Sequence, residues 1–150
     1  MQKENPQFNG YCYLDLASAS REVFKLTKDC CWEEERYYAL SQAADCFEQS
    51  NNLNLAADCH NQKGHSAQIL AEKCEQHHLE ELAGYWRKIS YHDFKESALL
   101  SKESHQRAHR FRRAGQAALN VFQNVQPSSS HSFYYSVLSF WHQLCGEKKD

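Results

Sequence analysis

The chain has 150 residues, with 17 Lys and Arg against 19 Asp and Glu, and a formal net charge of −2. This length suits one domain with one core, and so balanced a charge excludes a global attraction to nucleic acid or acidic membranes. With only two Ile, four Val and one Thr, the chain also lacks the β-branched residues from which sheets are built. The composition therefore predicts an all-α fold.

The seven cysteines are odd in number, and no apolar run of the secretory type follows the first residues. Free thiols in a reducing compartment are therefore expected, in the cytoplasm or alternatively the nucleus. No stretch approaches the roughly 18 apolar residues that a membrane span needs, so no span is predicted.

Apolar residues recur every three or four positions, as in amphipathic helices. Residues 1–10 are expected to be a flexible lead-in to a helical domain over 11–125, which begins with helices over about 11–28 and 32–49. The next pattern, from Asn54, is either one helix containing Gly64 or two helices hinged at Lys63–Gly64.

A short helix is expected over 79–89, and the pattern over 94–122 predicts one long helix or two helices that meet near Ser101. Residues 126–132 form a Ser/Pro linker, and 133–146 an aromatic amphipathic helix that either caps the array or binds a partner. The expected architecture is an array or bundle of five to seven antiparallel helices.

A short phrase occurs twice, thirteen residues apart, as Ala43-Ala44-Asp45-Cys46-Phe47 and Ala56-Ala57-Asp58-Cys59-His60. Small residues among large ones let two helices approach closely. Residues 37–90 resemble tetratricopeptide helical hairpins and, in the Ala-Ala-x-Cys-Phe phrase, the vesicle-fusion attachment proteins. His60 and Lys63 depart from the tetratricopeptide pattern. Gly64 falls near the end of that family's second helix, which favours the hinge.

A second, weaker unit can be written with Ala71, Cys74, Ala83 and Trp86, and a generic helical bundle is the alternative. The resemblance implies that the first helix of each unit lines a partner-binding groove. The eight groove residues are Tyr38, Ser41, Asp45, Glu48, His65, Gln68, Glu72 and Glu75. Because this groove is acidic, the implied ligand is a basic or amphipathic segment of another protein. An ordinary solvated helix face is the alternative.

Cysteine and histidine are concentrated over residues 59–78. Cys74 and His77 are one helical turn apart, so Cys59, Cys74 and His77 with a fourth ligand form an alternative zinc site. The spacing matches no standard zinc finger, and cysteine is also a common core residue. We therefore expect no metal and no other cofactor.

Basic residues are concentrated over residues 102–113. The predicted basic patch consists of Lys102, Arg107, Arg110 and Arg113. Such a helix binds phosphates, an acidic lipid surface or an acidic protein segment. The alternative is an internal partner, for which the acidic stretch 29–48 is available within the chain or in a second subunit.

The sequence contains no Gly-rich phosphate loop, no Gly-x-Ser-x-Gly and no kinase motif, so we expect no enzyme activity. The favoured function is an intracellular interaction or adaptor module that binds a basic or amphipathic segment of another protein, or self-associates. The alternatives are a zinc-binding helical protein and a basic-helix binder of nucleic acid or acidic lipid.

Overall fold

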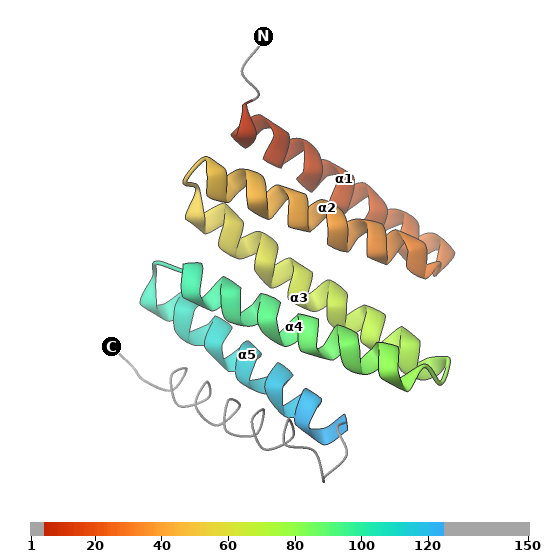
Figure 1. The fold of residues 1–150 in the computed structure, drawn as a ribbon. Helices are drawn as coiled ribbons and strands as arrows, with labels where there is room; N and C mark the ends of the chain where they lie inside the picture. The colour runs from red at the N-terminus through yellow and green to blue at the C-terminus, as the bar shows by residue number, and fades with distance from the viewer. Residues whose placement is uncertain (1–4, 125–150) are drawn as a thin grey trace.

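The structure is a computed structural model and describes residues 5–124. These residues form five helices and no strand: α1 (Pro6–Thr27), α2 (Cys30–Gln49), α3 (Leu53–Gln76), α4 (Glu80–Leu100) and α5 (Ser104–Asn124). The helices lie side by side in chain order, with α1 at one end of the array and α5 at the other (Figure 1). The prediction of an all-α helical array is confirmed. The predicted linker at 126–132 and helix at 133–146 lie outside the described residues.

Connections of two or three residues make neighbouring helices antiparallel. The side chains of Asn5, Asp29 and Asn52 accept hydrogen bonds from backbone amides at the starts of α1, α2 and α3. Three connecting residues adopt the left-handed conformation that commonly ends a helix: Lys28, Asn51 and His78. Local capping thus defines where each of the first four helices stops or the next begins.

Each helix packs against the helices before and after it in the chain, and no other pair of described helices shares an extensive interface. Buried alanines occur on all five helices, and a few large side chains such as Phe47 and Phe94 fill the space between them. Between α2 and α3, Ala43, Ala44 and Ala56 form one cluster with Phe47 and Cys59. The repeated small residues therefore serve close helix–helix contact, as the sequence predicted.

Helices α3 and α4 pack closely at Gly64. A Cβ atom added to Gly64 would lie 2.7 Å from the ring of Phe94, which is itself buried. Two buried serines of α4 donate hydrogen bonds to α3 carbonyls, Ser90 to Gly64 over 2.8 Å and Ser97 to Ala57 over 2.7 Å. These bonds satisfy buried polar groups and fix the two helices at short separation.

Three predicted boundaries are wrong. α3 is one helix without a hinge at Lys63–Gly64, because Gly64 provides space for Phe94 rather than a break. α1 begins at Pro6, inside the predicted lead-in, because Asn5 caps it and proline suits the first helical turn. α4 is continuous over the predicted gap between residues 89 and 94, where the polar Ser90 and Asp93 are buried. Of the two alternatives for residues 94–122, the structure has the break near Ser101.

The continuity of α3 also changes the predicted repeat units. The first unit corresponds to α2 and α3, but the second unit would take its first helix from α3 as well. Successive two-helix repeats do not share a helix. The structure instead forms consecutive hairpins α2–α3 and α4–α5, a five-helix packed array that is compatible with a helical repeat.

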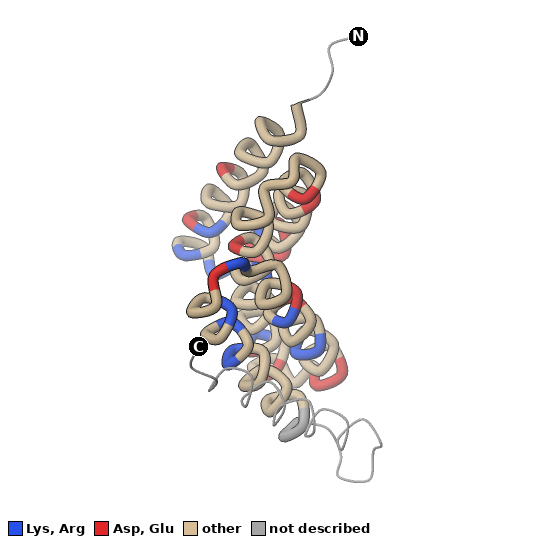
Figure 2. Tube along the Cα trace, turned by 90° about the vertical axis from the view of Figure 1, so that its left-hand side faces the viewer, with Lys and Arg blue, Asp and Glu red and all other residues tan. Residues whose placement is uncertain are grey.

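Acidic and basic residues are both distributed along the described helices (Figure 2). This agrees with the balanced net charge of the sequence.

None of the described helices is both long and apolar enough to cross a membrane.

Replacing Gly64 with alanine should destabilise the fold by up to about 2 kcal/mol. The gain in helix propensity of about 1 kcal/mol is smaller than the overpacking cost of about 1–3 kcal/mol against Phe94. Gly84 is the matched control, since an added Cβ there meets no atom within 4 Å. Gly84→Ala should therefore stabilise the protein by about 0.5–1 kcal/mol. Urea unfolding checks both values, and equal effects of the two substitutions would contradict the close packing at Gly64.

Candidate functional site

An aromatic row crosses from α2 to α4. Tyr38, Tyr37, Trp86 and Tyr85 follow one another with ring centroids 5.8, 5.3 and 5.4 Å apart, all in edge-to-face geometry. Such pairs add a favourable interaction beyond the area they bury. Trp86 is buried, whereas the two ends of the row, Tyr38 and Tyr85, are 57% and 55% exposed.

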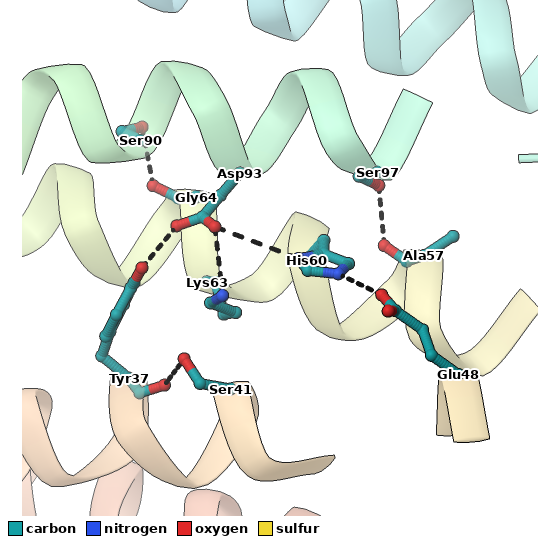
Figure 3. A network of polar contacts seen from close by, with 10 residues as sticks. All are labelled: Tyr37, Ser41, Glu48, Ala57, His60, Lys63, Gly64, Ser90, Asp93 and Ser97. Carbon is teal, nitrogen blue, oxygen red and sulfur yellow. Dashed lines mark hydrogen bonds and ion pairs between the residues drawn. The ribbon is translucent and has the colours of Figure 1, made fainter. Parts of the chain in front are cut away.

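Tyr37 also connects this row to a buried polar network (Figure 3). Its hydroxyl donates to Asp93 Oδ2 over 2.9 Å, and Asp93 Oδ1 lies 3.2 Å from Lys63 Nζ. The Lys63 ammonium is also 5.2 Å from the centre of the Tyr37 ring, within cation–π range. His60 Nε2 lies 2.8 Å from Glu48 Oε1, and its Nδ1 lies 3.9 Å from Asp93. The network joins α2, α3 and α4 through side chains far apart in the sequence.

Burial and the neighbouring carboxylates determine the protonation of this network. Burial, reinforced by the Asp93 carboxylate, raises the pKa of Tyr37 far above its ordinary value, so its hydroxyl remains a donor. Burial acts to lower the pKa of His60, but interaction with Asp93 and Glu48 outweighs it and leaves the pKa raised. His60 is thus the member of the network whose charge responds to mildly changing pH.

The α2 half of the predicted groove lies beside the aromatic row. Tyr38 is one end of that row, and Asp45 and Glu48 are exposed. Ser41 is half-buried and donates to the Tyr37 carbonyl over 3.1 Å. These four positions, spaced by three and four residues, lie on one side of α2.

The other half of the predicted groove lies on the C-terminal half of α3 and does not join the first. His65 faces α5, where Arg113 donates to it over 3.1 Å, and Glu75 pairs with Arg87 of α4. Gln68 is half-buried and Glu72 exposed. Within residues 5–124, no hydrogen bond or ion pair joins the two halves. The resemblance implied one groove lined by the first helices of two hairpins, but the second four residues lie on α3, which is the second helix of the α2–α3 hairpin.

The basic patch packs on α3. Arg110 is buried and donates to Asp58 and to the Ser101 hydroxyl, and Arg113 donates to Asn61 over 2.9 Å. Arg107 donates to the Ser101 carbonyl over 2.9 Å, while Lys102 is exposed. An internal partner was predicted as one alternative, but the acidic stretch 29–48 is not that partner, because α5 packs on α4 and reaches α3 rather than α2.

The alternative zinc ligands are far apart. Cys59 and Cys74 lie on one continuous helix, fifteen residues and therefore about 22 Å from each other. Among the described residues, no group of three or more His, Cys, Asp or Glu side chains is placed to hold a metal ion. The zinc site formed by Cys59, Cys74 and His77 is thus contradicted by the geometry.

The cysteine environments favour thiols over reactive thiolates. Burial raises the pKa of Cys59 to about 12 and also raises that of Cys74. A hydrogen bond with Asp29 raises the pKa of Cys31, which disfavours its thiolate form.

Sequence reasoning missed Tyr85, Lys63 and Asp93 as site residues. The adjacent pair Tyr85–Trp86 is a sequence signal for an exposed aromatic, because neighbouring positions of a helix point in different directions and both rings are not expected to face the core. Asp93 stands inside an apolar helical pattern, where a carboxylate requires a partner.

No family model, curated protein or solved structure matches this chain.

The raised pKa of His60 predicts that its contribution to stability depends on pH. Protonated His60 stabilises the fold, since its folded-state pKa exceeds the value of 6.5 expected when unfolded. This stabilisation is complete below about pH 6.5 and is lost as the pH rises through the folded-state pKa. His60→Gln should therefore be more destabilising at about pH 5.5 than at about pH 8.5.

Urea unfolding of both proteins at the two pH values checks this. The difference between wild type and variant isolates His60 from His65, His92 and His109, whose pKa values are lowered by burial. A difference in unfolding free energy that is the same at both pH values would contradict the role of the two carboxylates.

Proposed function

We propose that the chain is an intracellular protein-interaction module that binds a basic or amphipathic helical segment of a partner across α2 and α4. The observation that carries this proposal is the aromatic row, whose ends Tyr38 and Tyr85 are both more than half exposed. Tyrosine is favoured at protein interfaces because it buries a large area with little loss of side-chain freedom. Its position on rigid helices makes the surface preorganised.

The charge beside the row indicates which partner fits. Glu34, Asp45 and Glu48 are exposed on the same helix as Tyr38, and Glu34 lies one turn before it. A partner segment that packs apolar side chains on the two tyrosines would bring its flanking Lys or Arg side chains close to these carboxylates. Electrostatic complementarity of this kind favours association and orientation more than affinity.

The rigid base of the surface supports the same function. Trp86 and Tyr37 lie between the two exposed rings, and Tyr37 is held by Asp93. A tetratricopeptide-like arrangement, with α2 and α4 as the first helices of two hairpins, would place both tyrosines on the ligand-facing helices. The internal pairing of Arg110 and Arg113 makes a nucleic acid or acidic lipid ligand less favoured.

A direct test is titration with a designed Leu/Lys amphipathic helix of about 18 residues, or five turns. Isothermal titration calorimetry should give saturable binding, and the peptide with Glu in place of each Lys should bind at least about tenfold more weakly. Combining Tyr38→Ala and Tyr85→Ala should weaken binding of the basic peptide at least about tenfold, since interface tyrosines are frequent hot spots.

Leu26→Ala is the matched control, because Leu26 is 86% exposed on α1, away from the row. It should leave the affinity within about twofold. Equal affinity for the basic and acidic peptides, or equal losses in the tyrosine and Leu26 variants, would refute the proposed surface.

A further inference from the structure

A cleft of about 450 Å³ lies between α1 and α3, with α2 beneath it, separate from the aromatic row. Its lining contains three basic side chains, Arg21 and Lys25 from α1 and Arg36 from α2. Glu33 is the acidic residue among the described lining residues. A local excess of positive charge therefore occurs in a chain whose net charge is −2.

Arg36 provides a fixed cation at the base of this cleft. It is 5% exposed, and its Nη1 donates to Glu33 Oε1 over 2.9 Å. No hydrogen bond from its Nε or Nη2 is found in residues 5–124, and neither nitrogen is a buried atom without a partner. Arg36 lines the cleft, and its guanidinium has the planar geometry that suits an oxyanion.

The acidic residue of the cleft, Glu33, is paired with Arg36. Glu33 is only 1% exposed, and its second oxygen, Oε2, is buried without a hydrogen-bond partner. Its position in the first turn of α2 suits a carboxylate, because the N-terminal end of a helix carries positive partial charge. Glu33 therefore orients Arg36 while presenting little negative surface to the cleft.

Arg21 and Lys25 lie one helical turn apart on α1, and both are exposed. Lys25 also pairs with the exposed Glu22 at 2.7 Å, a contact that solvent weakens. The cleft is therefore lined by two exposed cations from α1 and one buried cation from α2, a set of donors that suits an anionic group.

The remaining walls indicate that the ligand is more than a free ion. Phe24 and Ile69 line the cleft with apolar surface, and Gln62 adds an amide that can donate and accept. His65 contributes a neutral ring, since burial and then Arg113 and Arg36 lower its pKa. The volume is in the range of small-molecule sites, about 300–1,000 Å³.

We propose that the cleft formed by Arg21, Lys25, Arg36, Phe24 and Ile69 binds a small organic phosphate, with the phosphate on the three cations and an apolar or aromatic body against Phe24 and Ile69. The site is independent of the partner-binding surface, because Arg36 and Tyr38 point to opposite sides of α2.

The probe that tests this is phenyl phosphate, titrated into the full chain and followed by the amide resonances in nitrogen–proton correlation spectra. Saturable shifts with a midpoint below about 1 mM are expected, in three segments around residues 21–25, 33–36 and 62–69. Inorganic phosphate, which lacks the ring, and benzyl alcohol, which lacks the charge, should each bind at least about tenfold more weakly.

Arg21→Gln with Lys25→Gln should weaken phenyl phosphate binding at least about tenfold, and both residues are exposed, so the variant should fold. The matched control is Arg112→Gln with Lys102→Gln, which removes the same two kinds of charge from exposed positions outside the cleft and should change affinity less than about twofold. Glu33→Gln, which removes the negative charge beneath Arg36, should tighten binding.

No saturable shift below about 1 mM, shifts outside the three segments, or equal losses in the two double variants would overturn the proposal. Inorganic phosphate that binds as tightly as phenyl phosphate would overturn the assigned ligand class, because the apolar wall would then contribute nothing.

Discussion

The close approach of α3 and α4 at Gly64 is the constraint on which the other contacts depend. The Phe94 ring occupies the space that a side chain at residue 64 would need. Ser90 and Ser97 of α4 then reach α3 carbonyls. With the two helices at this separation, Lys63 and His60 come within range of Asp93. A larger separation would leave charged groups buried without partners, which is costly.

The same contact gives α3 its central position in the array. Through Asp93 and Trp86, α4 holds Tyr37 of α2, and so fixes the base of the aromatic row. Arg113 of α5 reaches His65 of α3, a residue that also lines the α1–α3 cleft. The two candidate surfaces thus depend on one rigid helix and use different sides of α2.

The sequence was sufficient for the fold class, since seven β-branched residues cannot supply a sheet. It was also sufficient for the Ala43–Ala44 and Ala56 contacts, because small residues at helical spacing indicate close packing. It was not sufficient to decide whether α3 is hinged at Gly64, and the predicted hinge is wrong. Local propensity gives glycine the same signature whether it breaks a helix or makes room for a ring, and only the tertiary partner Phe94 distinguishes the two.

The candidate site could be predicted only in part for the same reason. The resemblance to tetratricopeptide hairpins named Tyr38, Asp45 and Glu48, three residues that lie on one side of a single helix. The partnership of Tyr37 with Asp93 joins residues 56 positions apart, and that of Arg113 with Asn61 joins residues 52 apart. No local pattern specifies such pairs, since they depend on the register between helices.

The most direct measurement is native-state amide hydrogen exchange of the full chain, resolved residue by residue along α3. A continuous helix packed on α4 through Gly64 predicts that the amides from Ala57 to Ala71 exchange as one strongly protected unit. Amides at residues 63–65 that exchange rapidly, with different protection on either side, would instead reveal a hinge. That result would remove the basis of both surfaces.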